Sequence, residues 1–363
     1  MTPFSTKFKL VDTHAHPDPL RGGLAPDISV YSVNDQLEED AQTNFSKMEL
    51  FVEFEFADSS DPFLDPEDPQ QSKSDDFRFE NDSEDATLAR GKLASYAAAH
   101  AESQFRIHTF CVLVCGEYAR LIRWDPDGAI VTRRFDYIQQ PHILAGFFWR
   151  YNHDDLDPSW KGYDASVSSI DHCNLVNIPQ IYLETLEKRN MAHREFRILR
   201  VPDRNNPEDE KQFVVSSPPN YTARSPFGRG TRPMLAFDME KGEIVFLKDY
   251  WRTDLDGIEK EGDIYSLLES SRVPNIPPFG KGNDVRDHKT LTHTLRDENW
   301  ACWSKDMMPL RHYRMSLDVV ARPLTSFCSS REFVSAIADA MDGRISFADV
   351  SRIVRLTPGF RSA

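Results

Sequence analysis

A glycine pair, a lysine and a glutamate follow one another along the chain in an order that suits the binding of phosphate groups. Gly228 and Gly230 stand on either side of Arg229, Lys248 follows the apolar stretch EIVFL, and Glu261 lies in a predicted helix. Glycine lets backbone N–H groups approach a phosphate, a strand lysine neutralises phosphate oxygens, and a helical carboxylate holds that lysine in place. These residues predict a site for the phosphates of a nucleotide.

Two carboxylates on neighbouring strand-like segments form a second candidate site. Asp27 opens one β-rich segment and Glu53 lies within the next. Carboxylates placed in this way bind Mg²⁺ in restriction-endonuclease-like domains, which also carry a lysine two residues after the glutamate. That position holds Glu55, which would repel phosphate, and Lys92 in the following predicted helix is the substitute. An active nuclease, a degenerate nuclease-like domain and simple surface acids all remain open.

Two histidines near the N-terminus raise the question of a metal-dependent hydrolase. His14 and His16 lie in the stretch LVDTHAHPD, which resembles the first strand of a TIM-barrel metal site. Such a barrel needs repeated strand–helix pairs and further ligands at later strand ends. The other nine histidines are scattered, and none clearly ends an apolar strand before a helix. We therefore expect the pair to lie at the surface or partly packed in a turn.

The first half of the chain predicts one mixed α/β domain over residues 1–155. An alanine-rich helix is expected over 86–101, and an acidic stretch over 57–85 is expected to be a solvated loop. β-forming residues and turn signals predict strands over 27–31, 48–56, 107–115, 118–124 and 129–135. Residues 156–193 are polar and serve as a connecting segment in this interpretation.

The second half predicts another sheet, over residues 194–341. Strands are expected over 194–201 and 211–215, as a pair within 227–251, and over 312–320. One helix is expected over 257–270 with Asp256 as its N-cap, and another over 330–341, capped by Ser330. Residues 342–363 form a divergent tail. The predicted fold class is α+β.

Composition limits the classes of function. The 363 residues carry a net charge of −15, which argues against a charge-driven nucleic-acid binder. Five cysteines form no CxxC pair, so a reduced intracellular compartment, cytoplasm or nucleus, is expected. No run of 18 apolar residues is visible, so no membrane span is expected.

Several stretches resemble the fungal-type protein kinase family. They are RGKLASYAAAHAESQFRIHTFCVLVCGEYARLIRWDPDGAIVT (90–132), GRGTR, GEIVFLKDYWR and HYRMSLDVVARPLTSFCSSREFVSAIADA (312–340), with shorter matches in PDISVY, MELFVEFEF and DPF. The resemblance covers roughly residues 7–340. It implies a kinase-like N-terminal lobe in which Lys248 contacts ATP phosphates, Glu261 pairs with it, and residues 317–322 form the adenine-facing hinge. ATP and Mg²⁺ are the ligands implied.

The chain departs from the kinase pattern after the hinge. No His-Arg-Asp segment occurs, no Asn follows Asn299, and no Asp-Phe-Gly-like segment is present; the third glycine of the phosphate loop is also replaced. Without a catalytic base and metal ligands we expect no phosphoryl transfer. The expected protein is a truncated, inactive pseudokinase whose exposed lobe face a protein partner covers. The alternatives are a metal-dependent nuclease-like domain and a non-catalytic scaffold.

Overall fold

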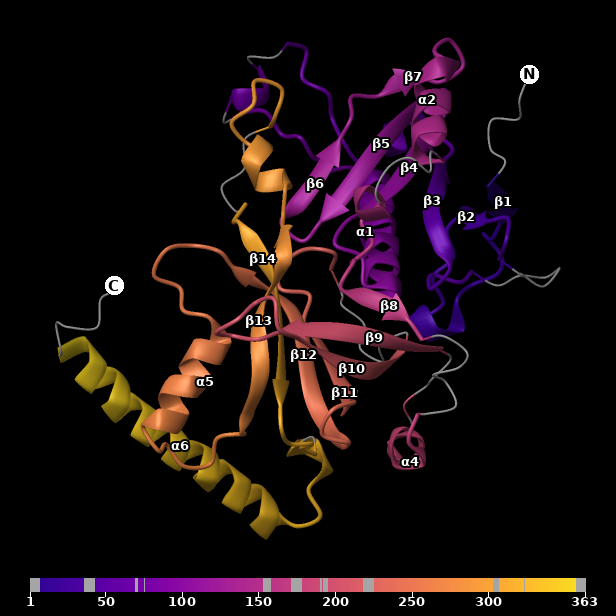
Figure 1. Cartoon of the computed structure of the whole chain (residues 1–363). Coiled ribbons are helices and arrows are strands. Elements are labelled where there is room, and N and C mark those ends of the chain that lie inside the picture. Colours follow the sequence, from indigo (N-terminus) through magenta and orange to yellow (C-terminus); the bar gives the residue numbers. More distant parts are fainter. Residues whose placement is uncertain are drawn as a thin grey trace.

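The computed structural model shows an α+β protein with two β-sheets (Figure 1). It describes residues 7–35, 43–68, 71–74, 76–152, 158–170, 178–189, 191, 195–217, 225–302, 307–322 and 324–356. The first sheet belongs to the N-terminal half and the second to the C-terminal half, and the two lie one above the other in Figure 1.

The first sheet has the strand order β1-β2-β3-β4-β5-β6, with β7 paired to β5. Its strands are β1 (Phe8–Asp12), β2 (Ile28–Ser32), β3 (Met48–Glu55), β4 (Thr109–Cys115), β5 (Tyr118–Asp125), β6 (Gly128–Val131) and β7 (Phe135–Asp136). Only the β3–β4 pair is parallel, because helix α1 (Glu84–Gln104) carries the chain back across the sheet between them. Ser83 caps α1 by accepting a hydrogen bond from Ala86 N.

Helices cover both faces of this sheet. On one face Leu93 and Tyr96 of α1 pack with Phe51 and Trp124 in a buried core. On the other face α2 (Pro141–Tyr151) buries Tyr151 against a second apolar cluster. This three-layer arrangement removes the apolar sides of β3 and β4 from water.

The second sheet is entirely antiparallel, with the order β13-β14-β12-β11-β10-β9-β8. Its strands are β8 (Val167–Ser169), β9 (Glu195–Pro202), β10 (Glu210–Ser217), β11 (Arg232–Asp238), β12 (Glu243–Thr253), β13 (Phe279–Lys289) and β14 (Leu310–Leu317). The sheet curls, so that the ends of β9 and β13 meet: Asn283 Nδ2 donates to Asp203 O at 2.9 Å, and Lys281 pairs with Asp209 at 2.7 Å.

The outer face of this curled sheet carries two helices. α4 (Gln180–Lys188) packs Tyr182 and Leu186 over β10 and β11. α5 (Glu261–Ser270), between β12 and β13, packs Tyr265 over an aromatic cluster that includes Tyr250 and Tyr313. α6 (Ser330–Leu356) follows β14 and passes the end of α5 (Figure 1).

A turn of the first sheet joins it to the second. Asp125 Oδ2 accepts the N–H of Leu291 at 2.9 Å, and the Asp127 carboxylate accepts those of His293 at 2.7 Å and Met308 at 2.8 Å. These carboxylates belong to the DPDG stretch (residues 125–128), which turns the chain between β5 and β6. Besides turning the chain, the stretch anchors the β13–β14 connection to the N-terminal half.

Most predicted elements are confirmed, and the largest boundary errors concern the two helices of the C-terminal half. The helix expected from residue 257 begins only at Glu261, with Lys260 at its N-cap position and no side-chain cap. The helix expected to end near 341 runs on to Leu356 and so crosses into the tail over 342–363. Ser329, rather than the expected Ser330, accepts the N–H of Glu332 at the start of this helix. The elements β8, β13, α2 and α4 were not predicted, and the strand expected over 129–135 is divided into β6 and β7.

The acidic stretch over 57–85 is more than a solvated loop. Asp61 is buried, and its two carboxylate oxygens accept hydrogen bonds from Arg120 Nε at 2.8 and 2.9 Å. Asp65 pairs with the same guanidinium at 2.8 Å. The Arg120 side chain is almost fully buried, so these carboxylates balance its charge. Part of the stretch is therefore a structural clamp on β5.

The connecting segment between the sheets packs closely at Gly162. A Cβ atom there would lie 1.9 Å from the His108 carbonyl oxygen, and the φ angle is +89°. We expect Gly162→Ala to reduce the free energy of unfolding by at least about 2 kcal/mol, because it adds both a clash and backbone strain. Urea denaturation measures this. Gly91→Ala, in α1 with open space around it, is the matched control and should not destabilise the protein.

Candidate functional site

The lysine and glutamate singled out from the sequence form an ion pair. Lys248 in the middle of β12 places its Nζ 2.8 Å from Oε1 and 2.6 Å from Oε2 of Glu261, the first residue of α5. Both side chains are about a quarter exposed, so the pair is anchored in the protein yet open to a ligand. A lysine held in this way offers a fixed positive charge to an anionic group.

Two residues missed from the sequence complete this cluster. Tyr250 lies two positions after Lys248 on the same face of β12, with the lysine Nζ 4.5 Å from its ring centroid. The guanidinium of Arg229 lies 4.9 Å from the same centroid. Burial, together with the nearby Glu261 carboxylate, raises the pKa of Tyr250, so this hydroxyl stays protonated. Two cations therefore face one carboxylate, which favours an anionic ligand.

The glycine pair lies apart from the ion pair, at the contact between the two sheets. Gly228 N donates to the Pro126 carbonyl at 2.7 Å, and Trp251 N donates to Arg229 O at 2.8 Å. Trp251 is three residues beyond Lys248 on β12, which is about 10 Å along a strand. The Gly228 N–H is thus already used within the protein. The rest of the β10–β11 connection, residues 218–224, lies outside the described part of the chain.

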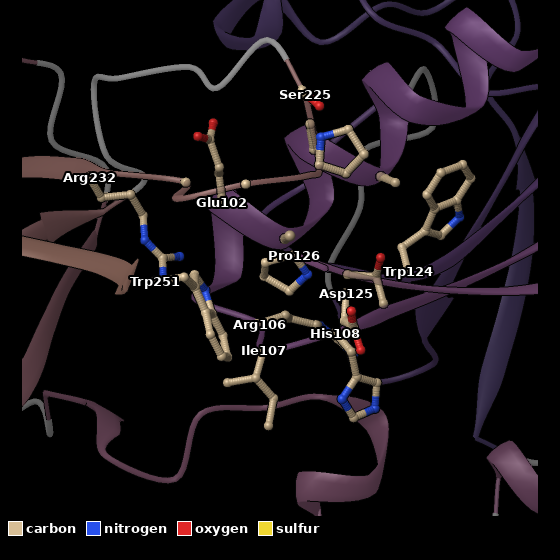
Figure 2. Close-up of a pocket in the computed structure, with 17 residues that line it drawn as sticks. Glu102, Arg106, Ile107, His108, Trp124, Asp125, Pro126, Ser225, Arg232 and Trp251 are labelled. Atoms are coloured by element: carbon tan, nitrogen blue, oxygen red, sulfur yellow. The ribbon is translucent and has the colours of Figure 1, made fainter. Parts of the chain in front are cut away.

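A small pocket marks this contact between the sheets. Figure 2 shows Arg232 and Trp251 of the second sheet on one side, with Pro126 and Trp124 of the first sheet on the other. Its volume of about 40 Å³ is too small for a nucleotide. The pocket is a packing feature of the interface.

A larger cleft of about 1220 Å³ also lies between the sheets. Its lining includes arginines and aromatic rings, among them Arg90, Arg296, Trp124, Phe227 and Trp300. The lysine of the ion pair does not line it. The cleft is large enough for a drug-sized molecule, but the charges at Lys248 lie elsewhere.

The two carboxylates predicted to hold a metal are neighbours. Asp27 N donates to Glu53 Oε2 at 3.2 Å, and Asp27 Oδ2 accepts the N–H of Phe54 at 2.8 Å. Burial and the adjacent Asp27 carboxylate raise the pKa of Glu53 to about 7. Lys92 Nζ lies 3.4 Å from Glu53 and 2.7 Å from Glu55. The lysine expected to substitute from α1 therefore reaches the carboxylates.

The histidine pair flanks these carboxylates without converging on them. His14 is exposed, and its Nδ1 lies 2.6 Å from Asp12; His16 is partly buried, as expected for a turn. The backbone N–H of Thr13 donates to Asp27 O at 2.9 Å, which ties this turn to the start of β2. Within the described residues, neither histidine joins a group of three convergent metal-ligating side chains.

The segment expected to form a hinge, residues 317–322, leaves the end of β14 and leads towards α6. Asp318 N donates to Pro278 O at 2.9 Å, which fixes its beginning. Beyond it, α6 exposes Val334, Ile337 and Met341 to solvent. Exposed apolar side chains on one helix are typical of an interaction surface.

Comparison with protein-family models, with curated proteins and with solved structures gives no match to this chain. Among the described residues, no helix combines the length and the apolarity needed to cross a bilayer.

Proposed function

We propose that residues 194–341 form a protein-kinase-like lobe that binds ATP, with the nucleotide phosphates at Lys248. The observation that carries the proposal is the pair between Lys248 and Glu261, at 2.6 and 2.8 Å, on a strand and on the helix that directly follows it. Kinases hold their ATP phosphates with a strand lysine fixed by such a helical glutamate.

The connectivity around this pair supports the proposal. In the run β10-β11-β12-α5, the lysine lies on the third strand and the glutamate on the next helix, as in a protein kinase. The resemblance of this part of the chain to fungal-type protein kinases points the same way. Arg229 and Tyr250 add a second cation and an aromatic ring to the phosphate side.

Titration calorimetry with ATP, ADP and adenosine tests the proposal. We expect ATP to bind at least about ten-fold more tightly than adenosine, because the cluster recognises charge on the phosphates. Equal binding of ATP and adenosine, or no binding of either, would contradict it. The second outcome would favour the alternative of a non-catalytic scaffold whose partner covers the apolar side of α6.

We further propose that the lobe binds ATP without transferring its phosphate. Transfer needs a catalytic base and side chains that hold Mg²⁺ across from the lysine. The sequence that follows the hinge has no His-Arg-Asp and no asparagine. Radiolabelled ATP should therefore give no labelled product with this chain. Turnover that disappears in Lys248→Ala would overturn this expectation.

A second candidate function rests on the Asp27 and Glu53 carboxylates. We propose that this end of the first sheet is a restriction-endonuclease-like site for Mg²⁺, with Lys92 supplying the cation that such sites place beside the metal. These groups are positioned by the antiparallel strands β1, β2 and β3, by helix α1, and by β4, which runs parallel to β3. Plasmid nicking with Mg²⁺, lost in Asp27→Ala, tests for nuclease activity.

The raised pKa of Glu53 predicts a pH dependence for Mg²⁺ binding. A carboxyl with a pKa of about 7 is mostly protonated at lower pH, and only its ionised form binds a cation. Affinity for Mg²⁺ should therefore increase by about ten-fold from about pH 6 to about pH 8. Calorimetric titration at each pH measures this. A pH-independent affinity would show that Glu53 is not a ligand.

A further inference from the structure

A buried cluster on the inner face of the second sheet brings together three side chains that ligate metals. Asp164 precedes β8, His288 lies near the end of β13, and His312 lies on β14. Asp164 and His312 are fully buried, and the His288 side chain is about an eighth exposed. The cluster occupies the face of the sheet opposite Lys248, because neighbouring positions along a strand face opposite ways and Asp249 contacts His312.

The potential ligand atoms lie close to the spacing that a metal ion requires. The Nδ1 atoms of His288 and His312 lie 3.3 Å apart; that of His288 lies 3.8 Å from Asp164 Oδ1 and that of His312 lies 3.8 Å from Asp164 Oδ2. Ligand atoms about 2.1 Å from a tetrahedral zinc ion are separated by about 3.4 Å. The nitrogen pair already meets this spacing, and each nitrogen–oxygen distance exceeds it by about 0.4 Å.

The surrounding contacts orient these ligands. The Asp249 carboxylate lies 2.6 Å from His312 Nε2, so that nitrogen carries the proton and Nδ1 presents its lone pair to the cluster. A carboxylate behind a ligating histidine is the usual support of a metal site. Asp164 Oδ1 is held by the N–H and hydroxyl of Ser166 at 2.8 and 2.5 Å.

The backbone of β13 departs from regular pairing with β14 in the segment that contains His288. Between the pairs Asp284–Tyr313 and Lys289–Arg311, β13 contains three more residues than β14. Arg286, within this bulge, has a φ of +47°, which is strained for a residue other than glycine. Strain of this kind is concentrated at functional sites.

We propose that Asp164, His288 and His312 bind a first-row transition-metal dication, with Zn²⁺ favoured by two imidazoles and one carboxylate. Water fills the remaining position, since the three side chains leave one tetrahedral site open. Arg314 and Arg232 already balance Asp164 and Asp249. A dication therefore adds positive charge to a cluster that is already balanced, and it binds more weakly than in a structural zinc site with thiolate ligands.

Cobalt titration of the metal-stripped full chain tests this proposal. Wild-type protein should bind one Co²⁺ with the strong visible absorption of tetrahedral coordination, and Zn²⁺ should displace it. We expect His288→Ala to weaken binding by more than about 100-fold, since it removes a direct ligand. His142→Ala, on the exposed side of α2, should bind as the wild type does. Circular dichroism establishes that both variants fold.

Three results would overturn the proposal: no Co²⁺ binding by the wild type, undiminished binding by His288→Ala, or the weak absorption of an all-oxygen octahedral site. X-ray absorption of the zinc-loaded wild type is the second measurement and does not depend on any variant. It should show imidazole scattering from two histidines. A spectrum without imidazole would exclude the site.

Discussion

Lys248→Met is expected to lower the affinity for ATP by at least about 30-fold, which corresponds to about 2 kcal/mol. The lysine is the cation fixed by Glu261 at 2.6 Å, and methionine keeps the apolar stem while removing the charge. Glu261→Gln should weaken ATP binding less, because the lysine keeps its charge and loses only the group that positions it. Calorimetry on the wild type and both variants gives the three affinities.

Lys188→Met is the matched control for this experiment. Lys188 lies on α4, is largely exposed and pairs with Glu184 one helical turn away. We expect its replacement to remove the same charge from the chain without changing ATP binding. If Lys188→Met and Lys248→Met reduced affinity equally, the effect would reflect net charge and the proposed position of the phosphates would be wrong.

Arg314→Met is expected to reduce the free energy of unfolding by about 3–5 kcal/mol. The Arg314 side chain is fully buried and contacts Asp249 and Asp164, each at 3.0 Å, as well as the carbonyl of Arg200. Methionine fills much of the volume of the arginine side chain, but it removes the positive charge that both buried carboxylates contact. Burial raises the pKa of each carboxyl group, and its cationic partners lower that pKa. For Asp249 the net result is a pKa well below the usual value.

Equilibrium urea denaturation measures this loss. Arg78→Met provides the control, since Arg78 is mostly exposed and pairs with Asp82 at 2.8 Å on the surface. It should change the free energy of unfolding by less than about 1 kcal/mol. A loss below about 1 kcal/mol for Arg314→Met as well would mean that the buried network contributes little to the stability of the second sheet.

Local patterns predicted the elements whose sequence signals agree with their environment. α1 is alanine-rich and is capped by Ser83, and β3 and β4 are apolar because both faces of their sheet are covered. The start of α5 was predicted too early because Asp256 and Glu259 imitate a capping box. Gly257 has a φ of +82°, so the chain makes a turn there before the helix begins.

Elements defined by distant partners could not be predicted in this way. β13 reads FGKGNDVRDHK, without alternation of apolar residues, and it is a strand because it pairs with β14. Asp164 lies in a polar connecting segment, and only the folded sheet brings Arg314 and His312 to it. The pair Lys248 and Glu261 could be predicted from the sequence because a strand and the next helix are neighbours in sequence as well as in space.

The most direct test of the central claim is a crystal structure of the full chain with a non-hydrolysable ATP analogue. Our account predicts a phosphate oxygen within hydrogen-bonding distance of Lys248 Nζ, about 2.7–3.2 Å, with Glu261 still paired to the lysine. A nucleotide bound only in the cleft between the sheets, away from Lys248, would contradict it.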